Sequence, residues 1–131
     1  MGDTNTPNRS SFPYYYGWGG EQFSFYRIPK LLITSEHFRK LSTDAKLLYG
    51  LMLDRMSLSM KNHWLDDQGR VYIFFPVEEV MQMLHCKSEK ATKLLAELDS
   101  KKGIGLIERV RQGQGKPSII YIKNFAGKEL G

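Results

Sequence analysis

The stretch from Ser88 to Phe125 limits most strongly what this chain can fold into. It opens with SEKATKLLAELDSK, in which Ala91, Leu94, Leu95 and Leu98 recur at the i, i+3, i+4, i+7 spacing of one helix face. Ser88 is the expected N-cap. Two β-rich runs follow, GIGLIERVRQ and SIIYIKNF, with the glycine-containing sequence GQGKP between them. We therefore predict an amphipathic helix and then a hairpin with an extended tip.

The net charge of +5 is concentrated in the same stretch. Basic and acidic residues balance at nine each from Met1 to Cys86, whereas nine basic residues face four acidic ones from Lys87 to Lys123. A local excess of this kind is typical of a phosphate-binding surface, although surface solubility alone also produces it.

The sequence before this stretch predicts two further helices and a hairpin. Ser42 is expected to cap the longest helix, in which Gly50 permits close approach of another helix. HWLDDQGRVYIFF predicts a hairpin with DDQG as its turn and Val71 to Phe75 as its second strand, and PVEEVMQML predicts a short helix after Pro76. The long helix is expected to bury a set of apolar residues at helical spacing: Leu48, Leu51, Met52, Met56 and Met60.

The first 21 residues differ from ordinary polar disorder because aromatic residues crowd among Gly, Pro, Ser and Asn. We expect a flexible arm at 1–21 that packs on its own domain, on a second copy or on bases. QFSFYRIP predicts a short N-terminal strand that Pro29 ends. The candidate dimer contacts are Tyr15, Trp18, Phe23 and Phe25.

A nucleotide-binding or catalytic site finds little support in the sequence. GQGKPS fails as a phosphate-binding P-loop because Val110 stands where the first glycine belongs and Pro117 where a Ser or Thr belongs. Cys86 is the single cysteine, and the three histidines lack metal-ligand spacing. We predict no catalytic residue, no metal and no cofactor.

No run of the sequence approaches the roughly 20 apolar residues that a membrane span needs, and the N-terminus lacks the apolar core of a secretory signal. A cytoplasmic protein with no membrane partner is the expectation.

Together these segments predict an α+β fold, a winged helix-turn-helix with an N-terminal strand and an aromatic arm. Lysines on the exposed face of the helix from Ser88 can reach phosphates or guanine, Thr92 a thymine methyl group, and Glu89 a cytosine amino group. A merely solvated helix face and a plain turn are the alternatives. The predicted DNA-binding residues are Lys87, Ser88, Glu89, Lys90, Thr92 and Lys93 on the helix, and Arg109, Arg111, Gln112, Gln114 and Lys116 on the hairpin.

Three segments resemble the N-terminal domain of the RepA_N family of plasmid replication initiators of Gram-positive bacteria. They are LSTDAKLLYGLMLDRMSLSMKNHWLDDQGRVYIFF, VEEVMQMLHCKSEKATKLLAELDSKKGIGLIERVRQGQGKP and IIYIKNF. The resemblance covers roughly Phe23 to Phe125. Pro76 departs from it, because a Ser or Thr cap is expected there in relatives.

This resemblance implies a winged helix similar to the N-terminal domain of the DnaD replication protein. It also implies that a homodimer binds double-stranded DNA at repeated origin sites (iterons) to start replication. The helix from Ser88 to about Lys101 would then be the recognition helix in the major groove, and Arg111 to Lys116 the wing.

Family members continue into a C-terminal domain thought to engage host replication proteins, so we expect a truncated chain. Its expected parts are the arm at 1–21, a winged-helix DNA-binding domain at 22–126, and the start of a linker at 127–131. Two alternatives remain open on sequence grounds. One is a winged-helix module for oligomerisation or interaction within the replication machinery, and the other is a transcriptional repressor.

Overall fold

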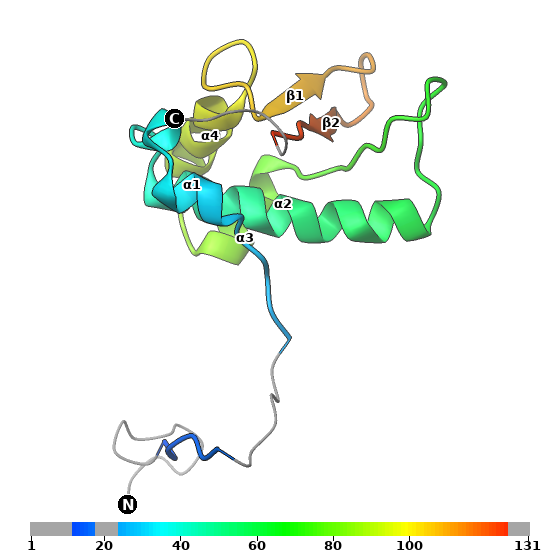
Figure 1. Cartoon of the computed structure of the whole chain (residues 1–131). Coiled ribbons are helices and arrows are strands. Elements are labelled where there is room, and N and C mark those ends of the chain that lie inside the picture. Colours follow the sequence, from blue (N-terminus) through cyan, green and yellow to red (C-terminus); the bar gives the residue numbers. More distant parts are fainter. Residues whose placement is uncertain (1–11, 18–23, 126–131) are drawn as a thin grey trace, which may run out of the picture.

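Helix α2 (Thr43–Lys61) is the longest element, and it contacts both the helix at Ser88–Leu98 and the strand at Ile119–Ile122 (Figure 1). The structure is a computed structural model that describes residues 12–17 and 24–125. The Ser42 hydroxyl accepts a hydrogen bond from the Ala45 amide at 3.1 Å, so the predicted cap of α2 is confirmed. Leu48, Leu51 and Met52 are buried as predicted.

The prediction that Met60 belongs to the core is wrong. Its side chain is 52% exposed, and Met56 is only partly buried. The reason is geometric, since the last turns of α2 run past the helices that pack on its first half (Figure 1).

Helices α3 (Val77–Leu84) and α4 (Ser88–Leu98) form the predicted helix pair. His85, which joins them, has the left-handed conformation with φ 54°. Helix α3 packs on α4, and α4 packs on α2. Arg55 on α2 reaches both the Glu79 carboxylate on α3 and the Phe74 carbonyl, at 3.0 Å from the latter.

Both ends of α4 differ from the prediction by a few residues. Lys87 is the N-cap in place of Ser88, and no side chain caps the helix. The helix ends at Leu98 and does not reach Lys101, because Asp99 has an extended backbone and the chain folds back there. The Gly103 amide then donates to the Asp99 carbonyl at 2.8 Å.

Strands β1 (Ile107–Val110) and β2 (Ile119–Ile122) form an antiparallel pair, with Ile107 opposite Ile122 and Val110 opposite Ile119. The hairpin predicted upstream is reduced to a bridge between Leu65 and Val71, and no second strand forms over 71–75. The backbone of this segment pairs with β2 instead. Ile73 exchanges hydrogen bonds of 2.9 and 2.8 Å with Ile120, so a third segment lies beside β2.

The predicted N-terminal strand is not formed in residues 24–29, and Phe23 lies outside the described residues. Helix α1 (Lys30–Thr34) begins directly after Pro29, and a 3₁₀ turn η2 (Glu36–Phe38) follows. Residues 24–29, which precede α1, cross α2 at Gly50, where an added Cβ would lie 2.9 Å from the Arg27 carbonyl oxygen. Gly50 therefore admits a close approach, but of an extended chain and not of a helix.

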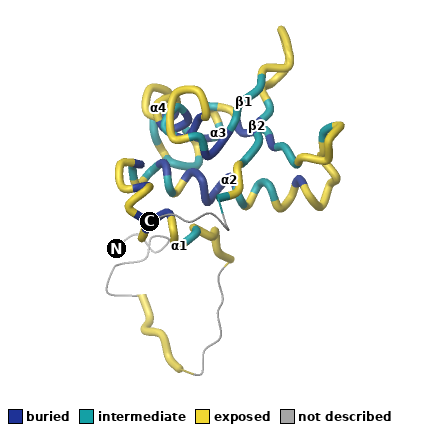
Figure 2. The backbone as a smooth tube through the Cα atoms, turned by 45° about the horizontal axis from the view of Figure 1, so that its top comes forward, coloured by how far each residue is buried: buried dark blue, intermediate teal, exposed yellow. Residues whose placement is uncertain are grey.

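The core lies where α2, α4 and the sheet meet, shown by the dark tube in Figure 2. Tyr49 ties the end of β2 to α2, since its hydroxyl donates to the Lys123 carbonyl at 2.7 Å. Burial raises the pKa of Tyr49 to about 12. None of the helices in residues 12–17 and 24–125 is long and apolar enough to cross a membrane.

Gly103 provides a test of how the hairpin joins α4. A Cβ there would lie 2.0 Å from the Glu97 carbonyl oxygen and 2.3 Å from that of Ala96, so backbone must move. We expect Gly103→Ala to lower the free energy of unfolding by about 3 kcal/mol in urea titrations. Gly17→Ala is the control, because nothing lies within 4 Å of its Cβ position; equal stability of the two variants would contradict this packing.

Candidate nucleic-acid interface

The outward face of α4 is the first part of the candidate site. The apolar stripe of the helix is buried, with Ala91 and Leu98 fully inaccessible. The opposite face is therefore turned to solvent, and Glu89, Thr92 and Lys93 are exposed on it as predicted. Lys87 and Ser88 are exposed at its start.

A carboxylate helps to hold α4 in the orientation that exposes this face. Glu97 accepts from the Ser42 amide at 2.9 Å through one oxygen and from the Ser42 hydroxyl at 2.8 Å through the other. The same hydroxyl caps α2, so one residue joins the start of α2 to the last turn of α4. Because both oxygens of the carboxylate are engaged, rotation of α4 about its axis is opposed.

Lys90 is held by a second contact between the same two helices. Its Nζ lies 2.6 Å from Oδ2 of Asp44, in the first turn of α2. The hydrogen bond to Asp44 and the negative charge of this carboxylate raise the pKa of Lys90. Lys90 thus lies at the edge of the exposed face with its charge already paired.

The connection between β1 and β2 is the second part of the candidate site. Residues 111–118 are all exposed, and they project from the body of the domain (Figure 2). Gly113 and Gly115 have φ of 128° and 80°, which side chains other than glycine rarely adopt. The Gln112 side-chain amide closes the loop by donating to the Pro117 carbonyl at 2.8 Å.

Charged side chains at this tip are available for binding. Arg111 and Lys116 are exposed and form no ion pair within residues 12–17 and 24–125, and Gln114 is exposed beside them. The tip therefore presents two free cations on a loop that two hydrogen-bonded strands support.

Arg109, also among the predicted residues, is placed differently. Its Nε lies 3.4 Å from Oδ1 of Asp99, and Asp99 is only 4% exposed. Burial alone would raise the pKa of Asp99, but the hydrogen bond and charge of Arg109 outweigh it and lower that pKa. In this position Arg109 links the end of α4 to β1.

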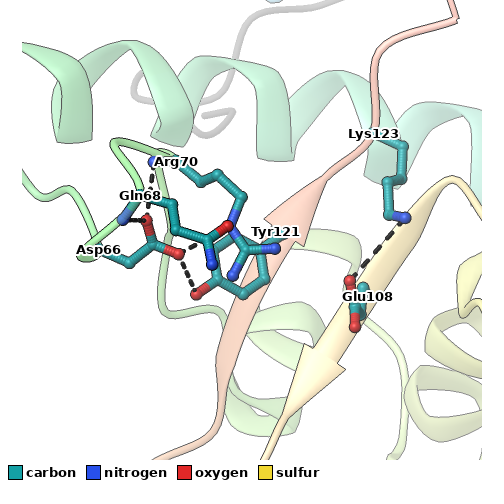
Figure 3. A network of polar contacts seen from close by, with 6 residues as sticks. All are labelled: Asp66, Gln68, Arg70, Glu108, Tyr121 and Lys123. Atoms are coloured by element: carbon teal, nitrogen blue, oxygen red, sulfur yellow. Dashed lines mark hydrogen bonds and ion pairs between the residues drawn. The ribbon is translucent and has the colours of Figure 1, made fainter.

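A polar network beside β2, absent from the sequence prediction, supports the hairpin from the outer edge (Figure 3). Asp66 accepts from the Gln68 and Arg70 amides at 2.9 and 2.8 Å, from Arg70 Nε at 2.7 Å and from the Tyr121 hydroxyl at 2.8 Å. The Arg70 guanidinium also lies 4.4 Å from the centre of the Tyr121 ring. The sequence signal was only the turn motif DDQG, which gives no hint of contact with Tyr121.

Lys101 and Lys102 are further basic residues that the site prediction omitted. Both are exposed in the turn between α4 and β1 and form no ion pair in the part of the chain that the structure describes. The charge count could have found them, since they contribute to the basic excess after Cys86.

Of the candidate dimer contacts, Trp18 and Phe23 lie outside the described residues. Tyr15 and Phe25 are 89% and 59% exposed. Within the described ranges, no three His, Cys, Asp or Glu side chains gather in a way that could hold a metal ion.

The helix pair α3 and α4, followed by the hairpin with its long exposed tip, defines a winged helix-turn-helix domain. The family model described as Replication initiator protein A (RepA) N-terminus, RepA_N, matches residues 24–130. The chain therefore belongs to the RepA_N family, and the resemblance inferred from the sequence is confirmed.

Similar proteins agree with this assignment. A structure described as a Rep–DNA complex is 40% identical with a TM-score of 0.66, covering 77% of this chain and 75% of that one. An N-terminal domain of a DNA-binding protein is 36% identical with a TM-score of 0.65, covering 81% and 85%. A 41 kDa protein of Lactobacillus helveticus is 32% identical over 104 residues, 75% of this chain, which spans only 29% of that protein.

Asp66→Asn tests the network beside β2. Burial would raise the pKa of Asp66, but hydrogen bonds from Arg70, Tyr121 and Gln68 outweigh it, and the pKa is lowered. A lowered pKa stabilises the fold above the unfolded value near 3.8, and this stability is lost as the pH falls below it.

We expect Asp66→Asn to be less stable than the parent at neutral pH, and the difference to shrink below about pH 4 in urea titrations. Asp67→Asn is the matched control, because Asp67 is an exposed carboxylate in the same turn and forms no ion pair among the described residues. If the two variants followed the same pH profile, the network would not stabilise the fold.

Proposed function

We propose that this domain binds double-stranded DNA sequence-specifically, as the DNA-binding part of a plasmid replication initiator. One observation carries the proposal: the exposed face of α4 and the exposed wing both present cations that have no ion-pair partner among the described residues. The ion pair between Arg109 and the buried Asp99 joins these two elements. Membership of the RepA_N family and likeness to a protein described in complex with DNA support it.

The face of α4 is suited to the major groove, whose width admits a helix. Lys93 and Thr92 lie side by side on it for contacts with bases or nearby phosphates, and Glu89 can accept from a cytosine amino group. Lys87 and Ser88 lie at the start of α4, where a lysine and a hydroxyl can contact the phosphate backbone.

The wing is suited to a different part of the duplex. Gly113 and Gly115 allow its backbone to approach closely, and Arg111, Gln112, Gln114 and Lys116 supply polar and charged groups. Arg111 and Lys116 then position the domain on the phosphate backbone or enter the adjacent minor groove. The targets we propose are repeated sites at a plasmid origin, the iterons.

Lys93→Ala and Lys116→Ala test this surface. If each lysine contacts a phosphate, its loss should weaken binding to all sequences and reduce the slope of log K against log salt by about 1. The probe is a short duplex that the parent protein selects from a random pool, compared with a random duplex in fluorescence anisotropy.

Lys30→Ala is the matched control, because Lys30 is an exposed lysine on α1, outside the helix pair and the hairpin. Parent-like binding by both test variants over the salt titration would rule out this surface.

A homodimer is also proposed, and exposed aromatic side chains favour it. Tyr14 and Tyr15 are 84% and 89% exposed, which is unusual for aromatic residues of a monomer. We propose that the arm and the residues directly after it join two copies, with Tyr15, Trp18, Phe23 and Phe25 as candidate contacts. This chain spans under a third of the L. helveticus relative. We propose that the remainder of a full-length initiator contacts host replication proteins.

Deletion of residues 1–21 separates this proposal from an interaction module without DNA specificity. We expect the shortened domain to elute from gel filtration at about half the apparent mass of the parent, because Tyr15 and Trp18, two of the four candidate dimer contacts, are lost. DNA selected by the parent should still be bound, only less tightly, through a single α4 and wing. An unchanged elution volume would contradict the role of the arm.

A further inference from the structure

Asp44 is a carboxylate at the edge of the surface proposed to face DNA. It lies in the first turn of α2, and the start of α2 runs beside α4, since Ser42 contacts Glu97 and Asp44 contacts Lys90. The side chains of Asp44 and Lys90 are 44% and 55% exposed, so the pair is on the surface. A negative charge there is unexpected for a phosphate-binding face.

Structural stability does not account for the pair. Ion pairs this exposed contribute little to folding, because water screens them and two long side chains lose freedom. The first turn of α2 is already capped by Ser42, and Glu97 already holds α4 against it. The pair has a larger consequence for binding than for stability. Three lysines lie along the first two turns of α4, namely Lys87, Lys90 and Lys93, and the pair engages the charge of one of them, Lys90.

We propose that Asp44 is a specificity-determining residue, which rests on the DNA-binding function proposed above. The ion pair with Asp44 keeps Lys90 from binding phosphates, whichever position along the duplex the domain occupies. Binding without sequence preference is almost entirely electrostatic and gains in full from each free cation. At the correct site, base contacts hold the domain in one register, so a free Lys90 cannot select the most favourable phosphate and gains less. A repulsive carboxylate therefore increases the discrimination between the two.

Asp44→Asn tests the proposal, because it frees Lys90 without changing the size of the side chain. With a random duplex as the probe, we expect the salt slope to steepen by about one unit. Extrapolated from 1 M to 0.1 M salt, a slope change of about 0.9 corresponds to roughly eightfold tighter binding. The duplex selected by the parent should gain less, so the ratio of the two affinities falls.

Three further variants make the test specific to this pair. Asp44→Glu keeps the charge and should behave as the parent. Asp54→Asn makes the same change in net charge on an exposed residue ten positions further along α2, about 15 Å of helix, and should have a smaller effect. Adding Lys90→Ala to Asp44→Asn restores the net charge and should return the slope to that of the parent.

The outcomes separate this inference from the function on which it rests. If the parent shows no salt-dependent DNA binding, the proposed function fails. If the parent binds and Lys93→Ala weakens binding, but Asp44→Asn matches Asp54→Asn or binds less tightly than the parent, only the role of Asp44 is overturned. Circular dichroism melting of every variant verifies that folded protein is compared, and Asp44→Ser, which also removes the charge, replaces Asp44→Asn if that variant is unstable.

Discussion

Burial of the apolar stripe of α4 is the constraint on which the rest of the structure depends. Each leucine of the stripe contributes roughly 1.5 to 3 kcal/mol when removed from water, so the helix has one favourable orientation against α2. That orientation turns Thr92 and Lys93 outward. It also places Glu97 against Ser42, where the hydrogen bonds secure an orientation that packing has already selected. The face proposed to bind DNA is thus exposed as a consequence of folding.

The basic residues of Lys87 to Lys123 fall into two groups, those near a carboxylate and those without one among the described residues, and the sequence alone does not distinguish them. Lys90, Arg109 and Lys123 each lie near a carboxylate, of Asp44, Asp99 and Glu108. The remaining cations of the basic segment have no such partner among the described residues, and these are Lys87, Lys93, Lys101, Lys102, Arg111 and Lys116. A net charge therefore overstates what a surface offers to phosphate, because paired cations have less charge to contribute.

Features coded by neighbouring residues could be predicted from the sequence, and features coded by distant ones could not. The cap at Ser42, the stripe of α4 and the two strands of the wing follow from local spacing, and the structure agrees. The prediction of an N-terminal strand was wrong, because strand propensity does not indicate whether a sheet edge is close enough to pair with. The partners of Lys90 and Arg109 depend on tertiary contacts, so the site was predicted as a set of positions without its pattern of free and paired charges.

The wing shows how a loop can be exposed and still have a defined shape. Its glycines would leave the backbone free in isolation, but the Gln112 side chain spans the loop to Pro117 and β1 and β2 hold its base. Ile73 and the Asp66 network then support β2 from the other edge. Order at the base lowers the entropy that the tip loses when it meets a ligand, so a short loop with two cations can contribute to binding where an unsupported one would contribute less.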